Sequence, residues 1–178
     1  MKLRECIEPA AIALNLGDVL GRELTDTDKQ LIACANNCID EIASEYLPIK
    51  KEKTVAAEGG LIAYSLLDEA VYDVLEVRDK KGNAVEFCVK PSHIQVEHDG
   101  EYTVCYCTRP PVLGVDDEVP IALKLSPRIL SYGIVAEYLL CGGFYEEAVT
   151  FDARFKDALK RATSGFKEKR IKLRRWLL

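Results

Sequence analysis

The chain has 178 residues, of which 48% are hydrophobic and 30% are charged. This composition excludes disordered and fibrous proteins and provides enough apolar residues for one hydrophobic core. The net charge of −5 argues against general affinity for nucleic acid, but it is unevenly spread: residues 163–178 carry six Lys or Arg and one Glu, which leaves about −10 on residues 1–162. A basic tail on an acidic body predicts that the tail has an acidic partner or folds back on the body.

The seven cysteines lie within periodic segments, and no two form a C-x-x-C pair. This scatter is typical of small buried hydrophobic residues in a reducing compartment, and it argues against a disulfide framework. Near the N-terminus, Glu5, Glu8 and Pro9 break any apolar stretch of the kind found in signal peptides. The run from Ala10 to Leu14 is too short to cross a bilayer. We therefore expect a chain that folds in a cytosol and has no membrane partner.

The N-terminal part of the chain predicts two helices. Residues 3–15 are compatible with a first helix, and a second follows a loop that contains Gly17 and Gly21. Thr25 or Thr27 is a good N-cap for the second helix, and Pro48 ends it near Leu47. Its buried stripe is expected to comprise Leu31, Ala35, Cys38, Ile42 and Tyr46.

From about residue 54 the apolar period changes to two, which predicts strands. Residues 61–67 and 71–78 are expected to be strands, and the second of them is expected to pair with 85–89 across the turn at 80–83. A second hairpin is expected to pair residues 94–97 with 102–107 around Asp99-Gly100. These strands predict an antiparallel sheet with one buried face and one solvated face.

The C-terminal part of the chain predicts a helix hairpin and a tail. Ser126 and Pro127 are typical of a helix start, and Gly142-Gly143 is typical of a helix end with a tight turn. A last helix is expected over 144–162, with Asp152–Lys156 and Asp157–Arg161 as exposed ion pairs. The expected buried residues are Leu130, Ile134, Tyr138 and Cys141 in the first of these helices, and Phe144, Ala148, Phe151, Phe155, Leu159 and Ala162 in the second.

These elements predict an α+β fold: a small helical bundle with an antiparallel β module inserted between the N-terminal helices and the C-terminal helix hairpin. The expected organisation is a single domain over residues 1–162, with the β insertion at about 54–108 and a basic tail at 163–178.

Residues able to carry out catalysis are scarce. The sequence lacks the phosphate-binding, dinucleotide-binding, zinc-protease and serine-hydrolase motifs. His93 or His98 could activate Cys105 or Cys107, but exposed turn histidines beside packed strand cysteines are the favoured interpretation. Cys105 and Cys107 share a strand face and would need two further ligands to hold a soft metal. We therefore predict no enzymatic activity, no catalytic residues, no metal and no cofactor.

The acidic loop Asp116-Asp117-Glu118 lacks the ligand spacing and the glycine of a calcium-binding loop. A solvated loop is favoured, and a contact with a basic partner is the alternative.

The basic tail is the most informative segment that the fold does not explain. Its charged residues precede Trp176-Leu177-Leu178, an apolar end that water does not favour. Docking onto a partner and a solvated tail both remain open, and Trp and Arg are frequent interface anchors. The residues predicted to dock are Lys169, Arg170, Lys172, Arg174, Arg175 and Trp176.

The chain also resembles a known family. Asp116-Asp117, the segments 125–140, 143–148 and 151–159, and the upstream Leu47-Pro48, Val77-Arg78-Asp79-x-x-Gly82 and Tyr102-Thr103-Val104-x-Tyr106 carry the resemblance. Their order over residues 25–162 is similar to that of tailed-phage head–tail connector proteins, namely adaptors of the tail tubular protein A type and prophage structural proteins encoded near them. The modest length and the cysteine richness of this chain depart from that pattern.

The resemblance implies a structural protein of the virion that forms a homo-oligomeric ring, commonly of twelve copies, at the head–tail junction. Its implied partners are the portal protein above it, which the tail segment Lys169–Trp176 would clasp, and a tail or stopper protein. The acidic body would let DNA pass through the ring without specific binding. The implied location is the virion, with the host cytoplasm during assembly. Two alternatives stay open: another tail-assembly protein, or a regulatory module whose basic tail contacts nucleic acid or an acidic protein.

Overall fold

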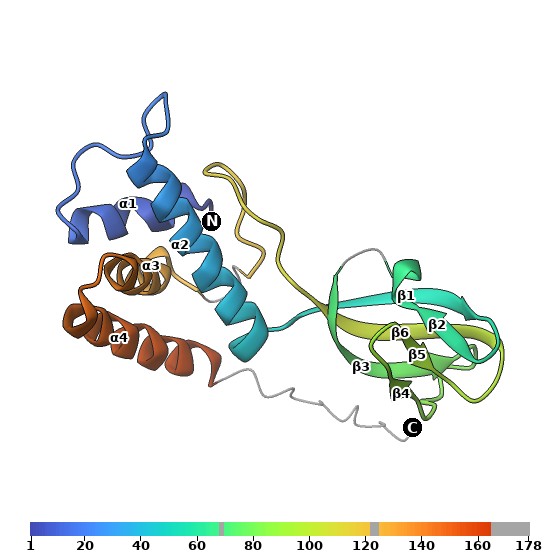
Figure 1. Ribbon diagram of the computed structural model, residues 1–178. Helices are drawn as coiled ribbons and strands as arrows, with labels where there is room; N and C mark the ends of the chain where they lie inside the picture. Colours follow the sequence, from blue (N-terminus) through green and yellow to red (C-terminus); the bar gives the residue numbers. More distant parts are fainter. Residues whose placement is uncertain (68–69, 122–124, 165–178) are drawn as a thin grey trace, which may run out of the picture. The chain divides into compact units, whose positions relative to one another are not determined.

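A computed structural model describes residues 1–67, 70–121 and 125–164 (Figure 1). Within these residues the protein has an α+β fold with four α-helices and two small antiparallel sheets. The α-helices are α1 (Arg4–Ala13), α2 (Asp26–Glu41), α3 (Pro127–Cys141) and α4 (Tyr145–Thr163). The strands are β1 (Ile49–Ala57), β2 (Leu61–Ala63), β3 (Val71–Asp79), β4 (Cys88–Val89), β5 (His93–Gln95) and β6 (Gly100–Thr108). No described helix combines the length and the apolar composition that a membrane span requires.

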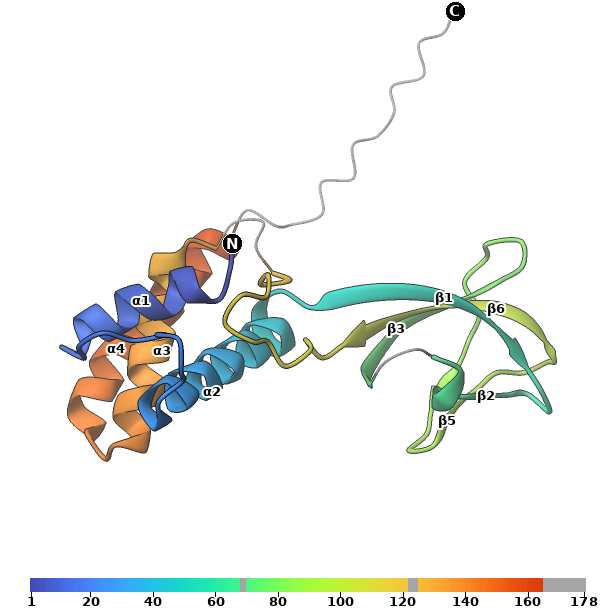
Figure 2. The same cartoon turned by 90° about the horizontal axis from the view of Figure 1, so that it is seen from above.

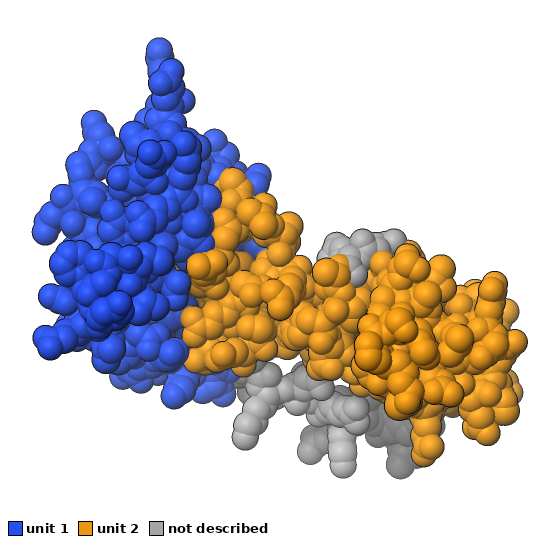
Figure 3. Space-filling view, in the orientation of Figure 1, with its two compact units in different colours: residues 1–35, 115–178 blue, residues 36–114 orange. Residues whose placement is uncertain are grey.

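The chain forms two compact units, which are coloured separately in Figure 3. The helical unit comprises residues 1–35 and 115–178, and the β unit comprises residues 36–114. The strands of the β unit begin at Ile49 rather than near residue 54, and they end at Thr108 as expected. The sequence prediction of a single domain over 1–162 stays a prediction.

In the helical unit, α3 packs against both α1 and α4 (Figures 1 and 2). The helix hairpin of α3 and α4 turns at Gly142-Gly143, where Gly143 has φ +81°. That left-handed conformation favours glycine. The fully buried side chains of this unit include Leu3, Ile7, Leu31, Leu130, Ile134, Phe155 and Leu159.

Two predicted features of the hairpin are wrong. Cys141 was expected to be buried but is exposed, and Phe144 is 58% exposed because it lies beyond the end of the packed region, at the N-cap of α4. The predicted ion pairs are confirmed, with 2.9 Å between Lys156 and Asp152 and 2.6 Å between Arg161 and Asp157.

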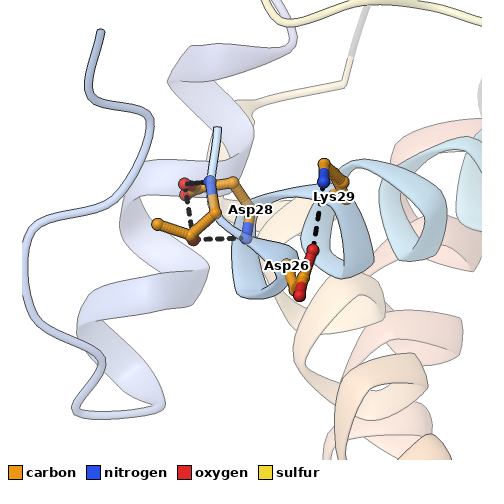
Figure 4. A network of polar contacts seen from close by, with 4 residues as sticks. Asp26, Asp28 and Lys29 are labelled. Carbon is orange, nitrogen blue, oxygen red and sulfur yellow. Dashed lines mark hydrogen bonds and ion pairs between the residues drawn. The ribbon is translucent and has the colours of Figure 1, made fainter. Parts of the chain in front are cut away.

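The start of α2 is fixed by a compact network of hydrogen bonds (Figure 4). The Asp28 carboxylate accepts hydrogen bonds from the Thr25 amide at 2.8 Å and the Thr25 hydroxyl at 2.7 Å, and the Asp28 amide donates to that hydroxyl at 3.2 Å. The Leu20 amide donates to the same carboxylate at 2.7 Å. This reciprocal capping satisfies amides that a helix start leaves without partners, and it confirms Thr25 as the N-cap.

The last turn of the helix predicted to end near Leu47 is a π-helix over Ile42–Tyr46. The Leu47 amide donates to the Ile42 carbonyl at 2.8 Å, a five-residue bond typical of π geometry. Pro48 then ends the helical segment, as the sequence predicts.

The N-terminus and the acidic loop hold each other within the helical unit. Amides of Leu3 and Arg4 donate to the carbonyls of Asp117 and Val115, at 3.0 and 2.9 Å. Arg4 also lies 3.6 Å from the Asp116 carboxylate. Asp116, Asp117 and Glu118 are exposed, as predicted for a solvated loop, and the loop's backbone bonds the first residues of the chain.

The β unit has two three-stranded antiparallel sheets, with strand orders β1-β6-β3 and β2-β5-β4. Both sheets contribute to one hydrophobic core, which includes Val55, Ile62, Val77, Ile94, Val104 and Tyr106. The Asn36 side chain binds both backbone groups of Leu113. Its Nδ2 donates to the Leu113 carbonyl at 3.0 Å, and its Oδ1 accepts from the Leu113 amide at 2.7 Å. This pair of bonds ties the two ends of the β unit together.

Of the two predicted hairpins, the one around Asp99-Gly100 is wrong in its pairing, and the one around 80–83 forms only beside its turn. β5 pairs with β2 and β4, and β6 pairs with β1 and β3, so residues 94–97 and 102–107 lie in different sheets. After the turn at 80–83, Ala84 forms an antiparallel bridge with Arg78, and the Val85 amide donates to the Val77 carbonyl at 2.9 Å. The chain then continues to β4, which pairs with β5. The first half of β1, residues 49–53, was not predicted to be a strand, because it is rich in lysine and lacks a clear apolar alternation.

Candidate functional site

The residues predicted to dock onto a partner, Lys169, Arg170, Lys172, Arg174, Arg175 and Trp176, lie outside the described residues. Their role stays a prediction. The described surface offers other candidate sites, first in the β unit and then in the helical unit.

The thiols of β6 do not have the properties of a nucleophile. Burial raises the pKa of the Cys107 thiol, and burial together with the charge of Glu52 raises the pKa of the Cys105 thiol. A catalytic cysteine requires the opposite shift, since the thiolate is the reactive form. His93 lies on β5, a strand that pairs with β2 and β4, and its Nδ1 is 3.0 Å from the Ser92 hydroxyl.

The outer face of the larger sheet carries a short ion-pair network. Glu52 on β1 and Glu76 on β3 lie opposite Cys105 on the central strand. Arg78 donates to both carboxylates, at 2.7 Å to Glu52 and 2.9 Å to Glu76. These hydrogen bonds raise the pKa of Arg78 further. The network satisfies its own charges, and no group of three metal-ligating side chains occurs among the described residues.

Tyr102 and Tyr106 lie on one strand but do not form a surface on which bases could stack. Both rings belong to the core of the β unit, with exposures of 8% and 1%. A buried ring has no face available for a base.

The helical unit has an open groove of about 660 Å³ between α3 and α4, at the end of the hairpin remote from its turn. The start of α3 contributes Arg128 and Tyr132, and the second half of α4 contributes Arg154 and the ion pair of Asp157 with Arg161. We call this feature the arginine groove. Its floor is formed by partly buried side chains, which are Ile129, Tyr132, Ala158 and Ala162.

Two cations of the arginine groove, Arg128 and Arg154, lie against aromatic rings. The Arg128 Nε donates to the Tyr132 hydroxyl at 2.7 Å, and its guanidinium lies 5.9 Å from that ring. The Arg154 guanidinium lies 5.6 Å from the centre of the Phe151 ring. The centres of the Tyr132 and Phe151 rings are 6.5 Å apart. Among the described residues, neither Arg128 nor Arg154 has a carboxylate within ion-pair distance. The groove therefore presents two oriented guanidinium groups that can bind an anionic partner.

The turn of the same hairpin has the opposite character. Leu140, Phe144, Tyr145 and Val149 are 49–68% exposed, and Glu146 and Glu147 stand in the first turn of α4. An exposed cluster of large apolar side chains beside charges is typical of an interaction site. We call this feature the acidic turn.

Sequence reasoning treated Arg161 as one half of an exposed ion pair and did not single out Arg128 or Arg154. The spacing of Glu147, Arg154 and Arg161 at intervals of seven residues was a usable signal, since it places them on one helix face. The contribution of Arg128 could not be found in this way, because it comes from the preceding helix.

Comparison with known proteins leaves the geometry as the basis for assigning a role. The chain matches no protein-family model and no curated protein.

Proposed function

We propose that this protein is a non-enzymatic head–tail connector of a tailed phage, which assembles as a ring between the portal and the tail. The observation that carries the proposal is the arrangement of the chain. All six strands lie between α2 and α3 in the sequence, and a helical unit with a C-terminal hairpin is built from both ends of the chain. The family that the sequence resembles has this order of elements.

The surface supports a role in packing against other proteins. The described residues offer an arginine groove and an apolar acidic turn, both of them open, and the strand thiols have raised pKa values. Such features suit protein–protein contacts better than the closed, polar cleft that catalysis favours. The net charge of about −10 on residues 1–162 would repel DNA that passes through a ring.

The proposal is tested with the tail, whose six predicted docking residues would clasp the portal. A chain truncated after Gly165 should keep its far-UV circular dichroism but lose binding to the portal protein encoded beside its gene. A matched control that lacks only Leu177-Leu178 retains Trp176 and every tail cation, so it should keep most of the binding. Unchanged portal binding after the longer truncation would refute the role of the tail, and no binding by the intact chain would refute the connector.

A regulatory module that binds an acidic partner is the second candidate. Arg128 and Arg154 favour it, because neither has a carboxylate within ion-pair distance among the described residues. It predicts that binding to a polyanion such as heparin weakens steeply with salt, whereas the connector predicts weak binding to polyanions at every salt concentration.

A further inference from the structure

We propose that the two ends of the α3–α4 hairpin are complementary halves of one interface, and that the acidic turn of one copy docks into the arginine groove of the next. This inference deepens the proposed function and rests on it for the closure of copies into a ring. The occupant of the groove is thus a second copy of this chain.

Three of the charged residues of α4 lie along one face of the helix. Glu147, Arg154 and Arg161 are spaced by seven residues, which keeps them within a narrow stripe. The exposed Phe144 lies just before the stripe. Arg161 lies about 21 Å along the helix axis from Glu147, because each residue of an α-helix advances the chain by about 1.5 Å. One face of one helix therefore carries an anion with an exposed aromatic at one end, Arg154 in the middle, and Arg161 in an ion pair with Asp157 at the other end.

The two ends also match in their apolar parts. The groove has a volume of about 660 Å³ and an apolar floor that includes Tyr132 and Ala158, which leaves room for an aromatic side chain. Phe144 is 58% exposed in the isolated chain and would be covered there. The guanidinium groups of the groove already contact aromatic rings, so a further ring beside them is compatible with their electrostatics.

The direction of the pairing follows from Arg154, which lies midway between Glu147 and Arg161. If two α4 helices paired antiparallel about a two-fold axis, each Glu147 would face an Arg161, but the two Arg154 side chains would meet at the axis. Like charges in direct contact disfavour that dimer. Head-to-tail docking avoids this clash, and such an interface continues from copy to copy until it closes as a ring or extends as a filament.

The test is a charge exchange on the full-length protein, with assembly measured by sedimentation velocity. Wild type should form species larger than a dimer as its concentration rises. Glu147→Arg and Arg154→Glu should each weaken self-association by about tenfold or more, since each places like charges at the contact. An equimolar mixture of the two variants should recover most of the lost association, because the reversed turn of one matches the reversed groove of the other. A variant that had merely misfolded could not produce this recovery.

Two matched controls carry the same change in charge off the stripe. Glu23→Arg lies in the exposed loop before α2, outside the hairpin, and Lys160→Glu lies on α4 but does not line the groove. Because neither residue belongs to the acidic turn or to the arginine groove, each variant should change self-association by less than about threefold. The inference would be overturned if the control and the test variants lost self-association equally, or if the mixture of the two test variants did not recover it. It would also be overturned if wild-type assembly stopped at a dimer, or if wild type stayed monomeric at ~1 mM.

Binding to the portal separates this inference from the proposed function. If the full-length chain assembles head-to-tail but does not bind the portal, the connector is refuted and the interface stands. If the chain forms a ring on the portal and the Glu147→Arg and Arg154→Glu variants form it as well as wild type does, the interface is refuted and the connector stands.

Discussion

Asp28 shows how one buried carboxylate organises a helix start. Its relative exposure is 1%, and its two oxygens accept hydrogen bonds from Leu20 and Thr25. These bonds favour the charged form, first the bond from the Leu20 amide and then those from Thr25, and they lower the pKa of the carboxyl. When the pKa of a carboxyl is lower in the folded than in the unfolded state, its charge stabilises the fold. The full stabilisation is present at pH values above the unfolded-state pKa of about 3.9.

The substitution Asp28→Asn should therefore destabilise the protein at pH 7 but have a smaller effect in acid. The stabilisation by the Asp28 charge is present above about pH 4, and it is lost as the pH falls toward the lowered folded value. Urea unfolding of both proteins between pH 7 and pH 3 measures the difference. The variant Asp26→Asn is the control, because Asp26 is almost fully exposed and bonds only Lys29 among the polar contacts drawn in Figure 4. A stability difference for Asp28→Asn that is independent of pH would contradict the assignment.

The seven thiols should divide by exposure when the native protein is alkylated. Burial raises the pKa of Cys6 and of Cys34 to about 12, and Cys38 and Cys107 are also buried. Cys88 and Cys141 are exposed. At pH 7.5 iodoacetamide should modify these two first, and the buried thiols should react only after unfolding, as measured by mass spectrometry of peptides. Rapid modification of Cys105 or Cys107 in the native protein would instead support the idea of a catalytic thiol.

At the scale of elements, the turn between β1 and β2 shows how a tight connection constrains its sequence. Gly59 and Gly60 have φ values of +61° and +72°, and Glu58 and Leu61 exchange both backbone hydrogen bonds at 3.1 Å. Two positive φ values in a two-residue connection are typical of the type I′ hairpin, which favours glycine at both positions. A Cβ atom at Gly60 would lie 2.8 Å from the Val96 carbonyl oxygen, whereas one at Gly59 would meet open space.

The two glycines should therefore tolerate alanine differently. Gly59→Ala incurs only the strain of a left-handed residue, about 1 kcal/mol. In Gly60→Ala the new Cβ atom would also clash with the Val96 carbonyl oxygen. Val96 is held close because its amide donates to the Gly60 carbonyl at 2.9 Å. We therefore expect the free energy of unfolding to fall by about 2–4 kcal/mol. Chemical denaturation of the two variants measures the difference. Equal losses would show that Val96 can move aside at little cost.

At the scale of the whole molecule, charge is segregated rather than balanced. The acidic turn and the arginine groove lie at opposite ends of one hairpin, and residues 163–178 carry about +5 against about −10 on the rest of the chain. A molecule of this kind can attract copies of itself through unlike ends while its body repels polyanions.

Self-association should consequently weaken as salt increases. Raising the ionic strength from about 0.05 to 0.5 M shortens the screening length and should shift sedimentation toward the monomer for wild type. Glu147→Arg, which no longer offers an attractive contact, should respond weakly or in the opposite sense. Wild-type association that strengthens with salt would indicate an interface dominated by apolar contacts.

Much of the fold was determined by the sequence alone. Local signals predicted α1, the Thr25 start of α2, the Pro127 start of α3, the turn at Gly142-Gly143 and the ion pairs of α4. Each of these depends on residues within about one helical turn, where propensity and capping act without help from the rest of the chain. The α+β class and the insertion of the strands between helices followed from the order of these signals.

Strand pairing and the arginine groove were decided only by the tertiary structure. Asp99-Gly100 has the sequence of a hairpin turn, yet the Asp99 carboxylate accepts a hydrogen bond from Gly60 at 2.6 Å and the flanking strands join different sheets. Arg128 and Arg154 meet only because α3 and α4 pack antiparallel. Pairing of this kind depends on burying a shared core between segments far apart in the chain, and local patterns do not record which distant partner buries the most surface.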